Sequence, residues 1–205
     1  MSVSEFIVLI SLAGWPLLPI GWIPMHALPW LRKKMGLFYY LIPLVLWPPL
    51  AFAVYVKRSC LVKYHIALPN SVHFIGWVLL LTGLFLFIYA GMVLRLWGIL
   101  GVPEVDKKIK SNLVTHGPYS LSRHPVYFAH SLIFTGIFFC TGIIPTLAIV
   151  FLDFFVTYFI IIPLEERELK ERFGKEFTAY KGRVPCFCPI MSIFNTVIGR
   201  IRNLK

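Results

Sequence analysis

The chain has 205 residues, of which 58% are hydrophobic and 14% are charged, and its formal net charge is +11 at pH 7. A soluble domain of this size could not bury so much apolar surface, and the long apolar runs lack the alternation of a β-barrel, so the composition predicts a multi-pass α-helical membrane protein. The basic residues stand in loops and in the tail beside hydrophobic segments, which is typical of membrane topology and argues against nucleic-acid binding.

Three hydrophobic segments make up the N-terminal part of the chain, residues 1–97. The first segment, residues 6–27, lacks the basic start and the cleavage site of a signal peptide, and its prolines predict a kinked helix. The second segment covers residues 37–56 and the third covers residues 72–97. Glycines in the third segment would let another helix approach closely, namely Gly76, Gly83 and Gly91.

The second half of the chain carries most of the acidic residues. A hydrophilic loop, residues 98–125, precedes an apolar stretch, residues 126–164, that is too long for one span. Gly142-Ile143-Ile144-Pro145 predicts the turn of a transmembrane helical hairpin within that stretch. Residues 165–205 predict a C-terminal amphipathic helix and an apolar interfacial tail. We therefore expect one membrane domain, residues 1–205, with an all-α fold of about five transmembrane helices.

The lysines and arginines orient the predicted spans. With the N-terminus outside, 17 of the 20 basic residues lie in segments that face the cytoplasm and 3 lie outside. This distribution follows the positive-inside rule. We therefore expect an integral membrane protein whose loop 98–125 and C-terminus are cytoplasmic, where they also meet anionic membrane lipids.

A polar stretch at residues 115–127 interrupts the apolar sequence just before the hairpin. It holds His116, Tyr119, Arg123, His124 and Tyr127 within a dozen residues. A chain that only crosses a membrane does not need such residues there. The stretch therefore predicts one wall of a binding site at the membrane surface.

Charged residues beyond the hairpin are expected to face this wall. Glu165 and Glu166 leave the membrane on the same side, where unpaired carboxylates are costly, so a cationic ligand group would neutralise them. Arg183 either extends its side chain to the interface or pairs with an anionic ligand group. Together these residues predict a site for an amphiphilic or zwitterionic ligand.

Other polar residues in the apolar half allow two interpretations. Asp153 is either functional or hydrogen-bonded to a neighbouring helix, and His130 faces either the site or a helix neighbour. Cys186-Phe187-Cys188 lacks the spacing of a redox or zinc motif, so we expect no metal site there. The sequence contains no phosphate-binding loop, zinc-protease motif or recognisable Ser/His/Asp arrangement.

Three groups of short motifs surround the hairpin, between about residues 113 and 185. They are His116-Gly117-Pro118-Tyr119 with Arg123-His124-Pro125-Val126-Tyr127, then Pro163-Leu164-Glu165-Glu166, and then Phe173-Gly174-Lys175-Glu176-Phe177 with Tyr180 and Arg183-Val184-Pro185. In order and spacing they resemble the isoprenylcysteine carboxyl methyltransferase family, within a wider group that includes the phospholipid N-methyltransferases. Ala129 and Phe177 stand where the family often has glycine and tyrosine.

The resemblance implies a small membrane enzyme that uses S-adenosylmethionine to methylate a lipophilic acceptor entering from the bilayer. By position, it implies that Arg183 lies near the substrate and that the cofactor pocket is lined by His116, Gly117, Tyr119, His124, Tyr127, Glu165 and Glu166. A carboxylate acceptor would need alignment and loss of water but no general base. A thiol or amine acceptor would need a proton acceptor, for which His124 and Glu166 are the candidates.

Two further functions stay open at the level of sequence. Membrane sterol reductases, which use a nicotinamide cofactor, have a similar Arg-His-Pro and C-terminal layout, although this chain is short for their additional helices. The third hypothesis is a non-catalytic membrane protein that keeps the fold. Within the methyltransferase hypothesis, a prenylated peptide, a phospholipid amine, a small thiol and a quinone-like lipid are all possible acceptors.

Overall fold

The fold is a helical membrane bundle. The computed structural model describes residues 2–99, 101–102 and 112–187, so the predicted tail with Cys188 and most of the charged loop, residues 103–111, lie outside the described residues. Four segments are long and apolar enough to cross a membrane: Val3–Ala27, Pro29–Val56, Asn70–Arg95 and Ile144–Phe173. A shorter apolar helix, Pro125–Thr141, stands where a further span was predicted. The predicted all-α, multi-pass fold is therefore confirmed.

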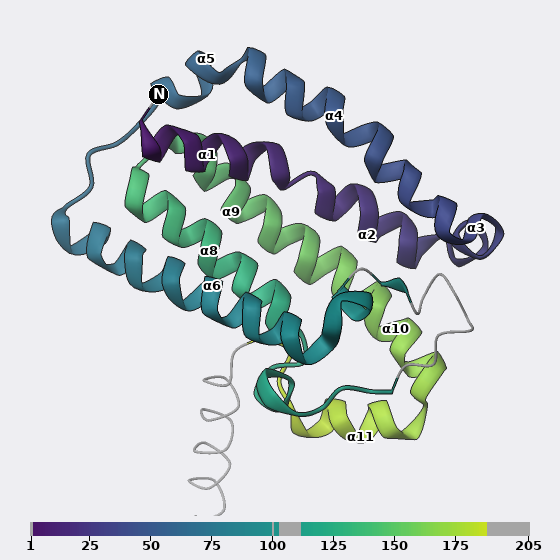
Figure 1. The fold of residues 1–205 in the computed structure, drawn as a ribbon. Helices are drawn as coiled ribbons and strands as arrows, with labels where there is room; N and C mark the ends of the chain where they lie inside the picture. Colours follow the sequence, from purple (N-terminus) through teal and green to yellow (C-terminus); the bar gives the residue numbers. More distant parts are fainter. Residues whose placement is uncertain (1, 100, 103–111, 188–205) are drawn as a thin grey trace, which may run out of the picture.

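The first hydrophobic segment is broken as its prolines predicted. Helix α1 (Val3–Gly14) ends before Pro16, and α2 (Leu17–Ala27) continues in nearly the same direction beside α4 (Leu41–Val56) (Figure 1). The short helices α3 (Pro29–Met35) and η1 (Gly36–Tyr40) connect α2 to α4, and α5 (Arg58–Lys63) follows α4. Tyr39 and Trp47 donate hydrogen bonds to carbonyl oxygens of the broken segment, at Gly21 and Ala13. These bonds attach η1 and α4 to the broken segment.

Helices α6 (Asn70–Ile99) and α8 (Pro125–Thr141) pack tightly along each other (Figure 1). A Cβ atom added to Gly136 would lie 2.6 Å from the backbone nitrogen of Leu80, and one added to Gly76 would lie 2.8 Å from that of Cys140. At Gly83 an added Cβ would lie 2.8 Å from the side chain of Ile133. The prediction that Gly76 and Gly83 admit a neighbouring helix is confirmed, and the neighbour is α8.

The predicted hairpin turn is also confirmed. Helix α8 ends at Thr141, Gly142 has a φ of +65°, and α9 (Ile144–Val156) begins two residues later. A Cβ atom on Gly142 would lie 2.2 Å from the carbonyl oxygen of Ile66, so glycine is required by both space and backbone conformation. One π-helical turn, η3 (Thr157–Ile161), joins α9 to α10 (Ile162–Phe173).

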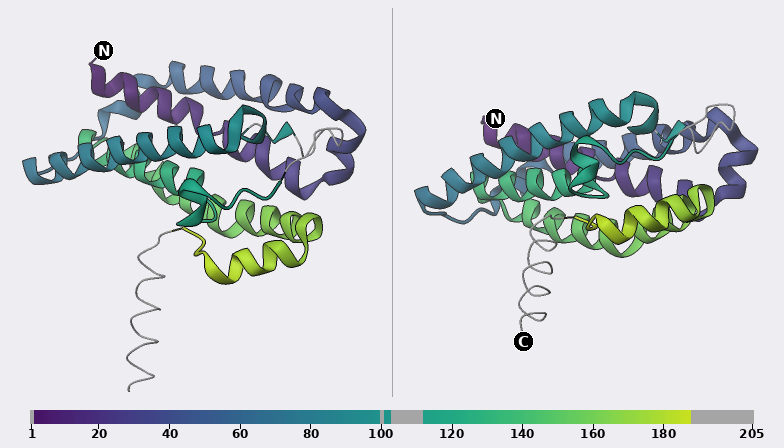
Figure 2. Two further views of the ribbon diagram at one scale, coloured as in Figure 1. Left: turned by 60° about the horizontal axis from the view of Figure 1, so that its bottom comes forward. Right: turned by 90° about the horizontal axis from the view of Figure 1, so that it is seen from below.

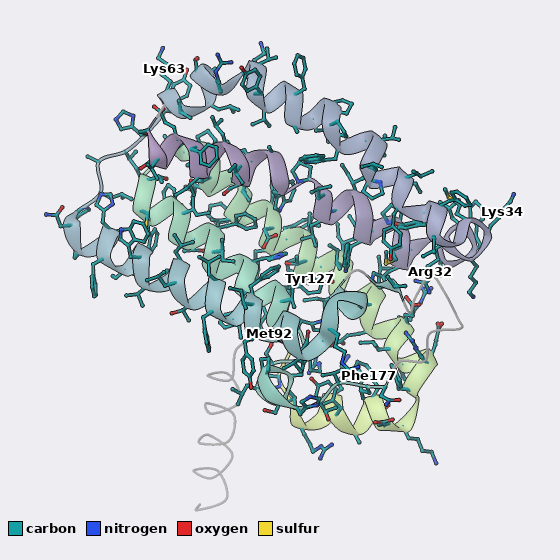
Figure 3. All side chains as sticks on the ribbon, viewed as in Figure 1. Arg32, Lys34, Lys63, Met92, Tyr127 and Phe177 are labelled. Atoms are coloured by element: carbon teal, nitrogen blue, oxygen red, sulfur yellow. The ribbon has the colours of Figure 1, made fainter. Side chains whose placement is uncertain are left out.

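The predicted amphipathic helix consists of two helices. Gly174, with a φ of +54°, ends α10 and starts α11 (Lys175–Arg183), so the prediction of one continuous helix was wrong. The chain turns at this glycine, and α11 returns past the end of the bundle (Figure 2). Tyr127 and Phe177 lie toward this end of the molecule and Lys63 lies at the other (Figure 3). We call the end formed by residues 115–127, α10 and α11 the loop end.

Candidate functional site

A cavity of about 1000 Å³ lies at the loop end and extends between the helices. Its lining comes from α1, α2, α6, α8, α10, α11 and the loop before α8, of which we call residues 115–124 the motif loop. Five of the residues predicted for the cofactor pocket line it: His116, Tyr119, His124, Tyr127 and Glu165. We call these five residues the polar end of the cavity. Sequence segments more than 100 residues apart thus meet around one space, whose size is within the range of ligand sites.

The motif loop is held in place by the residues that follow α11. The backbone N–H groups of Arg123 and His124 donate to the carbonyl oxygens of Pro185 (2.9 Å) and Cys186 (3.1 Å). The hydroxyl of Ser122 also donates to the Cys186 carbonyl oxygen, at 3.0 Å. The motif therefore keeps its shape because two distant segments share backbone hydrogen bonds.

A short 3-10 helix, η2 (Gly117–Ser120), turns the chain into the site. Gly117 has a φ of +60°, and a Cβ atom there would lie 3.2 Å from Val93, so the loop passes close to α6. The Tyr180 hydroxyl donates to the Tyr119 carbonyl oxygen at 2.6 Å. Burial raises the pKa of Tyr180 to about 12, and burial together with the nearby Glu165 raises the pKa of Tyr119 well above its usual value. Both phenols are therefore neutral hydrogen-bond donors at physiological pH.

Glu166 is the centre of a buried ion cluster. Its Oε1 atom lies 2.8 Å from Nε and 2.7 Å from Nη2 of Arg123, and 3.3 Å from Nε2 of His124. Its Oε2 atom accepts from Nζ of Lys181 at 2.5 Å. Sequence reasoning placed Arg123 in the same binding wall but expected a cationic ligand group to neutralise Glu166, and it did not include Lys181 among the site residues. The cluster fixes α10 against the motif loop and leaves Glu166 no free charge for a ligand.

Glu165 is placed differently from its neighbour. The Tyr127 hydroxyl donates to Oε2 of Glu165 at 2.9 Å, and Nδ1 of His124 lies 3.7 Å from the same oxygen. The Glu165 side chain is 27% exposed and lines the cavity, whereas the side chain of His124 is 3% exposed. His124 thus stands between the two glutamates, and Glu165 is the carboxylate that a cationic ligand group can reach.

Beyond Tyr127 the cavity continues as an apolar arm. We call this region the inner arm, and its residues are Ser11, Trp15, Leu18, Phe87, His130 and Phe134. Ser11, Leu18 and Phe87 come from α1, α2 and α6, and sequence reasoning named no residue of these helices for the site. No sequence motif marks them, because aromatic and aliphatic residues are also what a lipid-facing helix contains.

Arg183 and Asp153 also lie outside the cavity lining, as do Gly117 and Glu166 of the predicted cofactor pocket. Arg183 is exposed, and its Nε atom donates to the carbonyl oxygen of Ala179 at 3.3 Å. Asp153 is fully buried, and its Oδ1 atom accepts from Nε1 of Trp15 at 3.1 Å. Of the two interpretations of Asp153, the geometry favours a hydrogen bond to a neighbouring helix, and that bond fixes Trp15 in the inner arm. The role assigned to Arg183 stays a prediction.

One group of described residues has the spacing of metal ligands. Single ligand atoms of His124, Glu166 and Cys186 lie within 4.8 Å of one another. Burial raises the pKa of the Cys186 thiol to about 11, so the thiolate that a metal needs is disfavoured. Arg123 and Lys181 already neutralise Glu166 and would repel a cation. The surroundings therefore suit an internal ion cluster better than a metal.

Sequence comparison identifies the family. A model described as phospholipid methyltransferase matches residues 71–176, which is more than half of the chain and contains the motif loop, the hairpin and Glu165-Glu166. The chain belongs to this family. The resemblance stated from the motifs is therefore confirmed.

Two relatives of this phospholipid methyltransferase family member have names that concern metal resistance. The cobalt-zinc-cadmium resistance protein CzcN of Cupriavidus metallidurans is 37% identical over 120 residues, which cover 58% of this chain and 54% of that protein. The nickel-cobalt-cadmium resistance protein NccN of Alcaligenes xylosoxydans xylosoxydans is 35% identical over 102 residues, which cover 50% of this chain and 46% of that protein. The chain spans about half the length of these relatives. No solved structure matches the chain.

Proposed function

We propose that this protein transfers a methyl group from S-adenosylmethionine to a lipophilic acceptor in the membrane. The observation that carries the proposal is the continuity of one cavity, from the polar end around Glu165 to the apolar inner arm between membrane helices. A charged cofactor that comes from water needs a polar binding site, and an acceptor that comes from lipid needs an apolar site next to it. Family membership supports the reaction class.

The residues at the polar end have the charges that the cofactor requires. S-adenosylmethionine carries a sulfonium, an ammonium and a carboxylate. Glu165 offers a carboxylate to a cationic group, and the rings of Tyr127 and Tyr119 can contact the sulfonium or the adenine. Arginines that line the same cavity, Arg123 and Arg172, can attract the cofactor's carboxylate.

Catalysis in this proposal depends mainly on positioning. When bound, the cofactor supplies an activated methyl group. Tyr127 and His124 fix the Glu165 side chain, and the Arg123–Glu166 pair fixes the loop that carries His124. The apolar arm excludes water from the acceptor. Alignment of two reactants in a dry site can supply several kcal/mol, up to about 7–11 kcal/mol, of the barrier reduction.

The acceptor and the orientation are finer parts of the proposal. An isoprenylcysteine carboxylate is one acceptor suggested by the motif resemblance, and a phospholipid amine is another. We also propose that the loop end faces the cytoplasm, which the distribution of the 20 basic residues supports.

Calorimetric titration of the purified protein with S-adenosylhomocysteine in mild detergent tests the proposal. We expect the wild-type protein to bind, and we expect Glu165→Gln to weaken binding about 10- to 100-fold, because a hydrogen bond to a charged group contributes about 1.5–3 kcal/mol. Glu171→Gln is the matched control, since Glu171 is an exposed carboxylate on the same helix, with 70% of its side chain accessible. Absence of binding by folded wild-type protein would sink the proposal, and quenching of tryptophan fluorescence by NADPH instead would favour a reductase.

Metal binding is the second candidate function, because of the His124, Glu166 and Cys186 spacing and the names of the two relatives. Titration with Co²⁺ followed by visible absorption distinguishes the two functions. A thiolate–cobalt absorption band that disappears in Cys186→Ser would favour the metal site. We expect no such band, because Arg123 and Lys181 occupy the carboxylate.

A further inference from the structure

His130 is a polar side chain in apolar surroundings. Its ring stacks on Phe87, with centroids 5.4 Å apart, and lies 6.1 Å from the ring of Phe134 and 6.4 Å from that of Tyr127. The Nδ1 atom is buried and has no hydrogen-bond partner among the described residues. Part of the imidazole nevertheless lines the inner arm. A buried polar atom without a partner is costly, so its presence needs an explanation.

The other polar groups of the inner arm have partners within the chain. The Ser11 hydroxyl donates to the carbonyl oxygen of Ile7 at 2.8 Å, and Nε1 of Trp15 donates to Asp153. The Ser11 hydroxyl can still accept a hydrogen bond, but His130 is the side chain of this arm with a buried polar atom that has no partner among the described residues.

The position of His130 places it between the two parts of the cavity. It follows Tyr127 by three residues on α8, so the two side chains share one face of the helix, about one turn apart. His124 precedes His130 by six residues, which at a rise of about 1.5 Å per residue places it about 9 Å from His130 toward the loop end. An acceptor that enters the inner arm with its polar head toward the cofactor would bring that head to His130.

The charges along the cavity restrict what this head can be. Among the described residues, three arginines line the cavity. Arg95 lies near the end of α6, Arg123 lies in the motif loop and Arg172 lies in the last turn of α10. The inner arm contains none of them. The negative charge of a carboxylate head would have no positive partner in the inner arm. A neutral imidazole both donates and accepts hydrogen bonds, so His130 suits an uncharged head group.

We infer that His130 contacts the methyl acceptor and takes the proton from its nucleophilic atom, so that the acceptor is a lipophilic molecule with an uncharged, proton-bearing nitrogen, sulfur or oxygen. The inference rests on the proposed function. As the bond from the acceptor atom to the methyl carbon forms, the methyl–sulfur bond breaks, its electron pair stays on sulfur and His130 receives the proton. His130 later releases that proton to water through the polar end. A carboxylate acceptor would not need this step.

Nuclear magnetic resonance of the protein labelled with ¹⁵N-histidine, in lipid nanodiscs, tests the contact without turnover. The chain has six histidines, so the signal of His130 can be assigned by its loss in His130→Leu. With S-adenosylhomocysteine bound, we expect decanethiol to shift the His130 ring signals, and we expect decane and decanoate to leave them unchanged. Unchanged signals with saturating decanethiol, or equal shifts with decane, would overturn the inference.

Transfer of radiolabelled methyl to a total lipid and membrane-protein extract tests the proton transfer. We expect His130→Leu to lower transfer about 100-fold, as for loss of a general base, with unchanged affinity for S-adenosylhomocysteine. His65→Leu is the matched control, because it removes an exposed histidine outside the cavity lining and should leave transfer unchanged. Wild-type transfer by His130→Leu would contradict the inference alone, whereas failure of the wild type to bind S-adenosylhomocysteine would contradict the proposed function.

Discussion

The helices before and after residue 70 are stabilised in different ways. Helices α6 and α8 meet backbone to backbone at glycines, and the loop end is joined by backbone hydrogen bonds and the Glu166 ion cluster. Polar contacts of the N-terminal helices with this part include the Trp15–Asp153 hydrogen bond and the contacts of Glu168 with His26 and Arg32. The family match, residues 71–176, covers the α6–α8 contact and the Arg123–Glu166 pair, whereas Lys181, Pro185 and Cys186 lie beyond it.

This difference suggests that the two parts of the chain form different regions of the cavity. The C-terminal part supplies the polar end of the cavity. Helices α1 and α2 and the turn between them supply Ser11, Trp15 and Leu18 of the inner arm. The proposed cofactor site would then depend on features of the family match, while the acceptor would contact both His130 of α8 and helices outside that match. Variants that disturb one part and spare the other test this division.

The largest effect is expected for Arg123→Ala. It leaves Glu166, which is 10% exposed, without its main partner, and breaking a buried ion pair costs about 3–5 kcal/mol. Thermal unfolding in detergent measures the loss, and calorimetry should show that S-adenosylhomocysteine no longer binds. Arg167→Ala is the control, because Arg167 pairs with Glu171 at the surface with 66% of its side chain exposed, and its removal should change the stability by less than about 1 kcal/mol. Equal effects of the two variants would contradict the central role of the Glu166 cluster.

Glu168→Gln is expected to weaken the attachment of the N-terminal helices. The carboxylate is 20% exposed and holds the guanidinium of Arg32, whose side chain is 5% exposed, so its loss should cost about 3 kcal/mol of stability. Because Glu168 does not line the cavity, affinity for S-adenosylhomocysteine should change by less than about threefold, or about 0.6 kcal/mol. A loss of cofactor affinity as large as that of Arg123→Ala would mean that the two parts are not independent.

Gly136→Ala tests the close contact of α6 and α8. Its Cβ atom would lie 2.6 Å from the Leu80 nitrogen and 2.8 Å from the Gly76 oxygen, both of which are backbone atoms that cannot move aside. We expect a loss of about 1–3 kcal/mol, as for other overpacked sites, measured by thermal unfolding. Gly182→Ala is the control: space is open around Gly182 in α11, so alanine should be neutral or stabilise by up to about 1 kcal/mol.

Asp153→Asn should have a small effect, because an amide oxygen can still accept the hydrogen bond from Trp15. We expect a change in stability below about 1 kcal/mol, whereas Asp153→Leu should cost about 1–3 kcal/mol by leaving the buried indole N–H unsatisfied. Thermal unfolding measures both variants. A large loss in Asp153→Asn would show that the charge itself matters at this depth.

The sequence was sufficient for features that depend on local chemistry. The break near Pro16, the turn at Gly142 and the order of the apolar segments follow from proline, glycine and hydrophobic length, and the structure agrees. The partners of Glu166 could not be predicted, because Arg123 and Lys181 lie 43 and 15 residues away in the chain. The inner arm was missed because its residue types are also those of a lipid-facing surface.

The smallest expected effect is on the rate of thiol labelling where the motif loop contacts the segment after α11. Burial raises the pKa of Cys186 to about 11, whereas Cys60 is exposed. In a Cys188→Ser background, N-ethylmaleimide should label Cys60 first near neutral pH, because the thiolate is the reactive form. Labelling of Cys186 should keep rising as the pH approaches the pKa of its thiol, about 11. Peptide mass spectrometry measures both rates. Equal rates at neutral pH would mean that the segment after α11 separates readily from the motif loop. The C-terminal part would then not be more rigid than the N-terminal helices.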